Sequence, residues 1–303
     1  MLLLLALTAT IIRNDAQAQI HEAPKIIASA CDSTRQTIHV LTQIKSKIET
    51  AFQQIVLGKK TAAKLSVAAA ASTGEQAVAY AALAASAAGK IQAAEQKLAS
   101  NLDTLLKGAA AAAELTATEE LVAEAADLSL EARAGKQTST VSGTQAGLSL
   151  LFGTFGSGKG KCEAATETGD KRQSAQQAKA GEQISFAHLK GRPKTSTDQK
   201  VAALCGDNDQ APNDCNGDTD GTLVYFEVTA GTLLQENLKT YRSNTNANGE
   251  YAVDTKEDKG LLLRETYVTA RLNLIKQAEK AYDSTTFKAD SLINPALVTD
   301  GTA

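Results

Sequence analysis

The sequence predicts a mainly α-helical protein, built from a long antiparallel coiled-coil hairpin that a C-terminal helix extends to a bundle, with a loop-rich α+β lobe at one end. Alanine accounts for 55 of the 303 residues, and for 29 of the 84 residues from 51 to 134. Two long segments repeat apolar residues in steps of three and four, as a coiled-coil seam requires. Because alanine favours helix and lets helices approach closely, ordinary α/β enzymes and large open β-structures are disfavoured.

The first residues predict a secretory signal peptide over residues 1–18. An apolar run of about a dozen residues is too short to span a bilayer, which takes roughly 20. Arg13-Asn-Asp15 ends the run, and Ala16-Gln-Ala18 is a small-x-small cleavage site. The alternative is a buried N-terminal helix. Export would place the protein in an oxidising compartment.

Residues 19–134 predict the hairpin, with helices from Lys25 to Ala71 and from Glu75 to about Ala134. Ser72 with Glu75 forms a capping-box pattern at the turn between them. At 1.5 Å per residue the helices would be about 70 and about 90 Å long, so we expect a rod. The seam of the first helix takes in Ile27, Ala30, Leu41, Ile44, Ile48, Ala51, Ile55, Ala62, Leu65 and Ala69, with weak steps at Thr34, Thr37 and Gly58. The seam of the second takes in Tyr80, Ala84, Ala87, Ile91, Ala94, Leu98, Leu105, Ala112, Leu115 and Val122, with breaks at Asn101, Gly108 and Glu119.

The rest of the chain predicts a lobe and a third helix. Residues 135–254 are rich in Gly, Ser, Thr, Asn and Asp with short apolar runs, which favours loops and a few strands. In residues 255–303 we expect a helix from about Lys256 to Lys288 and a loosely ordered tail from residue 290. Its cap would be Thr255-x-x-Asp258, and its stripe Leu263, Tyr267, Ala270, Leu274 and Ala281.

Four cysteines predict two disulfides in an exported chain, and three pairings are open. Cys31 lies at the end of the rod opposite the turn, and the second helix returns the chain to Cys162 at that end. Cys205 and Cys215 are ten residues apart around Pro212, which suits a local bridge. We therefore favour Cys31–Cys162 with Cys205–Cys215, which would pin the lobe to the hairpin.

The sequence predicts no catalytic, cofactor-binding or metal site, and so no enzyme. The segment Gly153-Thr-Phe-Gly-Ser-Gly-Lys159 fits a phosphate loop, but it lacks the following Ser or Thr and any surrounding β-α-β alternation, so we interpret it as a flexible loop. Residues 216–227 match part of a calcium loop with Asn216 at the first position and no entering helix, which favours a solvated acidic loop and leaves weak calcium binding as an alternative. The other candidates are His21, His39 and His188, which are scattered, and the small basic patch of Lys190, Arg192 and Lys194.

Residue charge argues against a nucleic-acid partner. The chain has 31 Lys and Arg against 34 Asp and Glu, a net charge of −3. A phosphate-coated partner is held by a positive field that this composition does not supply.

Together, these features resemble the N-terminal domain of trypanosome variant surface glycoproteins, of a class A-like type. The resemblance rests on export, on two very long Ala-rich antiparallel helices and on a Gly/Thr-rich lobe. It also rests on the positions of two cysteines, one early on the first helix and one just past the second. It includes residues 76–86, Gln-Ala-Val-Ala-Tyr-Ala-Ala-Leu-Ala-Ala-Ser, and Lys200-Val-Ala-Ala-Leu-Cys205 before an acidic loop. It covers nearly the whole chain and depends on no short diagnostic motif.

The resemblance implies a homodimeric cell-surface coat glycoprotein that shields a parasite from host antibodies and complement by antigenic variation. It implies attachment to the outer face of the plasma membrane by a glycolipid (GPI) anchor in a full-length protein, whose Cys-rich C-terminal domain and anchor signal are not within residues 1–303. The alternative is a surface receptor on the same scaffold that binds a host serum protein. Its lobe candidates are Phe152, Phe155 and Phe186, which core packing explains equally well.

Overall fold

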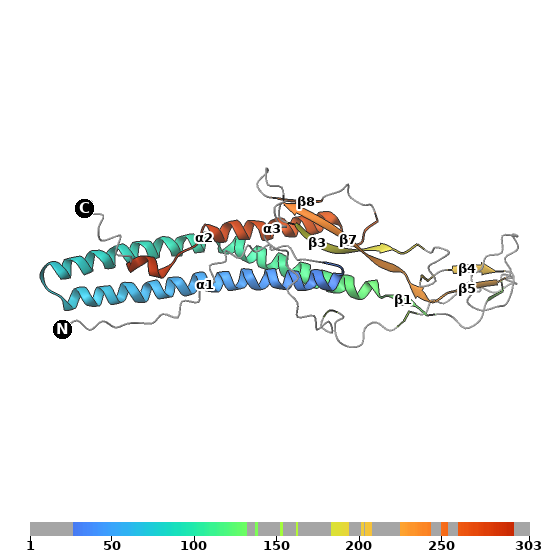
Figure 1. Cartoon of the computed structure of the whole chain (residues 1–303), viewed down its shortest axis with the longest axis horizontal. Helices are drawn as coiled ribbons and strands as arrows, with labels where there is room; N and C mark the ends of the chain where they lie inside the picture. The colour runs from blue at the N-terminus through green and yellow to red at the C-terminus, as the bar shows by residue number, and fades with distance from the viewer. Residues whose placement is uncertain are drawn as a thin grey trace.

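Two long antiparallel helices form the axis of the molecule (Figure 1). The computed structural model describes residues 27–131, 137–138, 152–153, 162, 183–193, 201–202, 204–207, 225–243, 250–253 and 260–293. Helix α1 spans Ala30–Ala71 and α2 spans Gly74–Ala126. Their 42 and 53 residues give lengths of about 63 and about 80 Å. The predicted fold class, a helical hairpin with a third helix and a β-containing lobe, is confirmed.

The ends of the two helices differ from the prediction. Ser72 is the C-cap of α1, and Thr73 is the N-cap of α2 but makes no side-chain cap hydrogen bond, so the predicted capping box is wrong. Both residues are extended, and the chain turns at Gly74, whose φ of +61° costs a glycine little. Helix α1 starts at Ala30 instead of Lys25, and α2 ends at Ala126 because the following residues pair as strand.

The predicted seam is buried along most of its length. Its buried apolar members are Ala30, Ile44, Ala51, Ile55, Ala87, Ile91, Ala94, Leu98, Leu105, Ala112, Leu115 and Val122, whereas Tyr80, near the turn, is 38% exposed. Five positions that the sequence marks as weak are also buried, namely Thr34, Thr37, Gly58, Gly108 and Glu119. Three of them contact an element outside the hairpin, because Gly58 lies against Phe287, Gly108 against Ala278, and Glu119 accepts a hydrogen bond from Ala187 of β3. A seam between two helices is therefore an incomplete description of the core.

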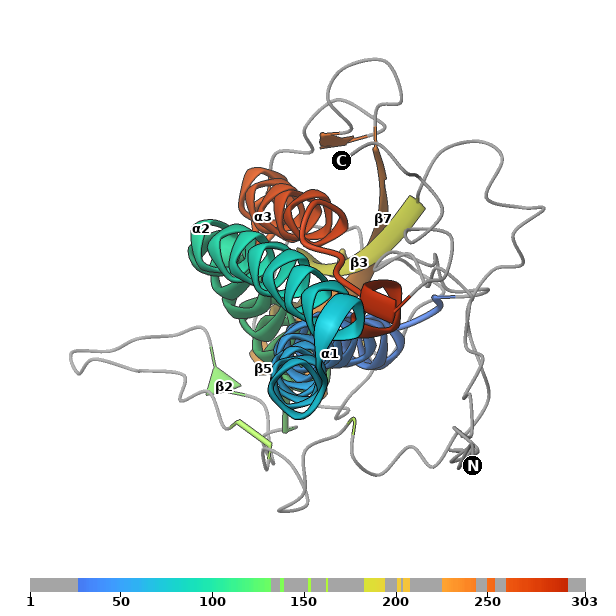
Figure 2. The same cartoon turned by 90° about the vertical axis from the view of Figure 1, so that its left-hand side faces the viewer.

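Helix α3 spans Glu265–Asp283, shorter than predicted, and lies beside α2 (Figure 2). Its buried face is Val268, Leu272, Ile275 and Ala278, whereas most of the predicted stripe is half-buried or exposed. The buried face differs from the predicted stripe because α3 packs against both α2 and strand β8 (Tyr251–Val253). The predicted cap at residues 255–258 lies outside the described residues. None of the helices in the described ranges is long and apolar enough to cross a membrane.

The lobe contains three small antiparallel sheets within the described residues, with strand orders β1-β6, β2-β5-β4 and β3-β7-β8. The third sheet lies beside the bundle, and the other two lie beyond the end of α2 (Figure 1). The inner face of the β3-β7-β8 sheet contributes Ile184, Phe186, Tyr241 and Tyr251 to the main hydrophobic core cluster. The strands are β1 Ser129–Leu130, β2 Gln137–Thr138, β3 Gln183–Gly191, β4 Leu204–Asp207, β5 Tyr225–Val228, β6 Gly231–Thr232, β7 Leu234–Ser243 and β8 Tyr251–Val253. A 3-10 helix, η2, spans Ala289–Ile293 and packs on α1. The division of the chain after residues 18, 134 and 254 stays a prediction.

Candidate functional site at the helix–sheet junction

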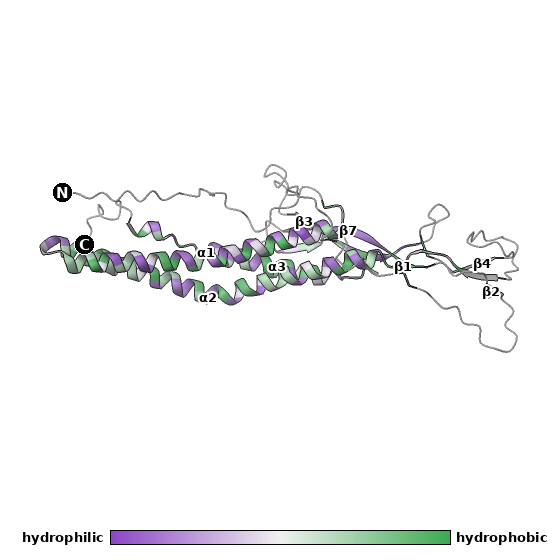
Figure 3. Ribbon diagram, turned by 90° about the horizontal axis from the view of Figure 1, so that it is seen from below, coloured by the Kyte–Doolittle hydropathy of each residue, from purple (hydrophilic) through white to green (hydrophobic). Residues whose placement is uncertain are grey.

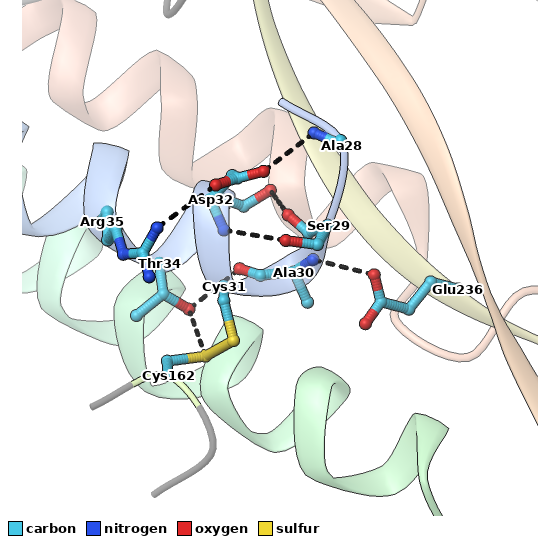
Figure 4. Close-up of polar contacts among 10 residues, drawn as sticks. Ala28, Ser29, Ala30, Cys31, Asp32, Thr34, Arg35, Cys162 and Glu236 are labelled. Carbon is cyan, nitrogen blue, oxygen red and sulfur yellow. Dashed lines mark hydrogen bonds and ion pairs between the residues drawn. A yellow bond between two sulfur atoms is a disulfide. The ribbon is translucent and has the colours of Figure 1, made fainter. Parts of the chain in front are cut away.

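The first turn of α1 is fixed by a set of polar contacts (Figure 4). The Ser29 hydroxyl accepts a hydrogen bond from the Asp32 amide at 3.3 Å, and the Asp32 carboxylate accepts one from the Ala28 amide at 3.0 Å. This reciprocal cap satisfies two amides at the helix start. The Ala30 amide donates to the carboxylate of Glu236 on β7 at 2.9 Å, so the same turn is joined to the sheet.

A disulfide between Cys31 and Cys162 closes this end of the rod, as predicted. The two Cα atoms are 4.9 Å apart, and the bridge links residues separated by 131 positions. The predicted partner bridge is not described, because Cys215 lies outside the described residues. For Cys205 the structure describes only the backbone, in strand β4, so Cys205–Cys215 stays a prediction.

Glu119 of α2 is a fully buried carboxyl group at the junction with β3. Its Oε2 accepts a hydrogen bond from the Ala187 amide at 3.0 Å, while Oε1 has no hydrogen-bond partner among the described residues. Burial raises the pKa of this carboxyl to about 8, against the opposing effect of the Ala187 amide and the Ser33 hydroxyl. Near pH 7 the side chain is therefore mostly neutral, which is how a buried acid avoids the cost of an unpaired charge.

His188 of β3 forms the centre of a second buried group. Its Nδ1 is 2.7 Å from the Leu263 carbonyl oxygen and its Nε2 is 2.8 Å from the Tyr241 hydroxyl. A carbonyl can only accept, so Nδ1 carries the proton and the Tyr241 hydroxyl donates to Nε2. Burial lowers the pKa of His188 and raises that of Tyr241, which keeps both side chains neutral. The ring of Tyr241 also packs edge-on against Phe186, with centroids 6.0 Å apart.

A buried charge pair completes the junction. The Glu265 carboxylate at the start of α3 lies 3.5 Å from Nζ of Lys239 on β7. Glu265 is 1% exposed, so removing either partner would leave a poorly solvated charge. Together with Glu119 and His188, the pair connects α2 and α3 to β3 and β7.

The arrangement fits a structural role. Both nitrogens of His188 are occupied and the ring is buried, so it can neither bind a metal nor take a proton from a substrate. Glu119 is likewise shielded from solvent. No group of three or more His, Cys, Asp or Glu side chains in the described ranges is placed to hold a metal ion.

The remaining sequence motifs are not brought together. Only Gly153 of the glycine loop is described, and its amide donates to the Ser129 carbonyl at 2.9 Å. Residues 154–161 and 208–224, which include most of the acidic loop, lie outside the described residues, as do His21 and Lys194. His39 is a half-buried residue on α1, and Arg192 donates to the Thr232 hydroxyl at 2.8 Å. Of the receptor candidates, Phe186 belongs to the core, Phe152 is exposed and Phe155 is not described.

Two features of the junction escaped the sequence analysis although their signals are present. Ser29-x-x-Asp32 is a capping pattern that places the start of α1 correctly. Glu119 occupies a seam position of the second helix, and an acid at a position that must be buried indicates a polar partner. Because Glu119 is interpreted as a break in the seam, the packing of β3 at this position is not predicted.

Comparison with solved structures identifies the architecture. No protein-family model matches the chain, and no curated protein matches it significantly. The variant surface glycoprotein VSGsur, solved as a derivative used for phasing, matches over 92% of this chain and 85% of its own, with a TM-score of 0.56 and 17% identity. Variant surface glycoprotein VSG13 matches over 93% and 79%, with a TM-score of 0.50 and 15% identity. The chain therefore has the fold of the trypanosome variant surface glycoproteins.

Proposed function

We propose that the protein is a cell-surface coat glycoprotein that shields a trypanosome from host antibodies and complement through antigenic variation. The observation that carries this proposal is the likeness to two variant surface glycoproteins, each over more than nine-tenths of the chain. In this proposal the chain is exported, acts on the outer face of the plasma membrane, is held there by a glycolipid anchor when full-length, and pairs with a second copy through its helical bundle.

The shape of the molecule supports a shielding role on physical grounds. A hairpin of about 63 to 80 Å presents a small cross-section for its length, so many copies can stand side by side on a membrane. Alanines in the seam keep the rod slender because the helices approach closely. A shield works by density and needs no reactive group, and the junction described above acts as a brace between rod and lobe.

Surface abundance tests this proposal. Quantitative labelling of intact producing cells should identify the protein as the dominant surface species. A minor surface species, or a protein found only in the medium, would contradict a coat. In that case the receptor alternative would be tested next, by incubating the protein with serum and identifying what it retains.

A further inference from the structure

The end of the hairpin nearest the turn is almost without charge. Between Lys64 and Lys90 lie 25 residues, of which 12 are alanine and one, Glu75, is charged. Soluble protein surfaces carry about a quarter to a third charged residues, so a solvated segment of this length should contain about six. We call residues 65–89 the apolar tip. Figure 3 shows green, hydrophobic segments close to the turn at this end of the rod.

The protein itself does not bury the apolar tip. No residue from Lys59 to Ser86 is buried. Val67, Val78 and Tyr80, its most exposed large side chains, are 68%, 70% and 38% exposed. Apolar surface that stays in water is unfavourable, and an exposed apolar patch on a soluble domain marks contact with a partner or a membrane. The tip therefore has a surface that a second apolar phase would cover.

Three lysines without acidic partners lie where the apolar tip begins. Lys60, Lys64 and Lys90 are exposed, and none of them forms an ion pair in the described ranges. The ion pair of Lys59 with Glu95 shows which residues of the two helices are level. Because Lys64 and Lys90 each lie five residues closer to the turn than a member of that pair, they are at about the same height. The turn is eight residues, or about 12 Å, beyond Lys64, so positive charge gathers just above an uncharged end.

The C-terminal elements approach the turn end of the rod (Figure 1). Ala278 of α3 lies against Gly108, whereas Phe287, nine residues later, lies against Gly58, which is closer to the turn. The last described element, η2, packs on α1 in the same half of the rod. In the proposed coat a glycolipid follows the C-terminal part of the chain, so the turn end faces the membrane and the lobe faces outward. The inference rests on the proposed function in this respect.

From this arrangement we propose that the apolar tip binds the surface of a phospholipid bilayer. Val67, Val78 and Tyr80 enter the boundary between headgroups and acyl chains, and the three lysines contact lipid phosphates. Tyrosine favours this boundary, and a lysine can bury its stem while its ammonium group stays in water. Ser72 to Glu75 are mostly polar, and no described helix is long and apolar enough to span a bilayer, so the tip lies in the interface without crossing it.

Charge and size favour a bilayer over the C-terminal segment of the same chain. Residues 294–303 contain one acid, Asp300, which cannot balance three lysines. A phospholipid surface presents a phosphate in every headgroup, and each basic residue close to an anionic membrane surface strengthens binding several-fold. The length of the tip, about 12 Å, is also comparable with the depth of about 5–10 Å to which interfacial helices bury their apolar faces.

Tryptophan fluorescence can locate the tip, because the chain contains no Trp. The chain from Gln19 onward, carrying Tyr80→Trp, is mixed with vesicles of phosphatidylcholine that contain about 30% phosphatidylglycerol. The emission should shift to the blue, and phosphatidylcholine with brominated acyl chains should quench it at least twofold. Phe52→Trp is the matched reporter, because Phe52 is 47% exposed on α1 but lies about 30 Å from the turn, and its emission should not change.

Sedimentation with the same vesicles measures the affinity and tests the apolar contact. The double variant Val67→Asp with Val78→Asp should lower the partition coefficient at least tenfold, because two charges would then enter the acyl boundary. Val56→Asp is the matched control, since Val56 is 50% exposed on α1 outside the tip, and it should leave the coefficient within threefold. None of these side chains is buried, so the variants should keep the fold, which circular dichroism verifies.

The lysines are tested by changing the charge of the vesicle. The triple variant Lys60→Gln, Lys64→Gln and Lys90→Gln should lower the partition coefficient at least tenfold on the anionic vesicles. On vesicles of phosphatidylcholine alone it should stay within threefold of the wild type, because that surface has no net charge.

Three outcomes would overturn the proposal. These are a wild-type chain that sediments with neither kind of vesicle, a Val56→Asp variant that binds as weakly as the double Asp variant, and a Tyr80→Trp emission that is blue-shifted without vesicles and is not quenched by brominated lipid. The last would show that another part of the chain covers the tip. Surface abundance tests the coat separately, so the two proposals can fail independently: a dominant surface protein can leave its tip in water, and a rare one can still bind lipid.

Discussion

Replacing Glu119 by Gln removes a titrating group from the junction while keeping its shape. The carbonyl oxygen of the new amide can still accept the hydrogen bond that the Ala187 amide donates to the carboxylate at 3.0 Å. The variant therefore imitates the protonated form of Glu119 at every pH. We expect it to abolish one large contribution to the pH dependence of folding.

The direction and size of that contribution follow from the pKa of Glu119, which burial raises from 4.5 to about 8. The folded state holds this proton more tightly than the unfolded state, so its stabilising effect is fully present below pH 4.5 and is lost as the pH rises towards 8 and above. A shift of about 3.5 units at 1.36 kcal/mol per unit corresponds to about 5 kcal/mol, an order-of-magnitude value. Relative to the wild type, Glu119→Gln should be within about 1 kcal/mol at pH 5 and several kcal/mol more stable at pH 9.

Urea unfolding followed by circular dichroism, with the disulfide intact, measures this difference at pH 5, 7 and 9. The difference between variant and wild type is the relevant quantity, because all other titrating groups cancel. Glu124→Gln, an exposed neighbour on α2, is the matched control and should change stability by less than about 0.5 kcal/mol at each pH. A Glu119→Gln difference that stays constant between pH 5 and pH 9 would refute the assignment of a neutral buried carboxyl.

Three further substitutions probe other contacts of the rod. Gly108→Ala should lower the thermal midpoint and the free energy of unfolding by about 1–3 kcal/mol, because the added Cβ would overlap the Ala278 side chain of α3. Gly89→Ala is the control, because it has open space around it and should raise the free energy of unfolding by about 1 kcal/mol. Cys31→Ser should cost about 2–5 kcal/mol in urea unfolding, because the bridge closes a loop of 131 residues; an unfolding midpoint equal to that of the oxidised wild type would contradict this. Tyr241→Phe should cost about 1–3 kcal/mol by the same assay, since it leaves a buried histidine nitrogen without its donor; an unchanged midpoint would contradict that hydrogen bond.

Much of the hairpin is predictable because helix propensity and the apolar repeat are both properties of neighbouring residues in the sequence. Helix propensity and a three–four repeat of apolar residues identify both helices, and export with four cysteines suggests the bridge at Cys31. Several seam positions that the sequence marks as weak are those where a third element packs against the two helices. Gly58 lies against Phe287 and Gly108 against Ala278, so these glycines, weak positions in a two-helix seam, provide the space in which the C-terminal elements pack.

The lobe and the orientation of α3 depend on contacts that sequence periodicity does not contain. Strand β3 pairs with β7 over nine residues, although 42 residues separate the end of one from the start of the other. The buried face of α3 is set by the sheet as well as by α2, so a stripe chosen for a partner helix alone is rotated. The two hydrogen bonds of His188 likewise join it to segments distant in the chain, which no local pattern around the histidine indicates.

The low sequence identity to the solved glycoproteins is expected, because the helical rod restricts the residue type at only a small share of its positions. The fold requires small or apolar residues along the seam, glycines where elements cross, and a handful of buried polar groups at the junction. Most other positions on α1 and α2 are exposed, and substitutions there usually change stability by about 0.5 kcal/mol or less. A sequence can therefore diverge to 15–17% identity and keep the rod. The coat function proposed above needs a surface that changes freely over a core that does not, and the separation of constrained seam from unconstrained surface is consistent with that proposal.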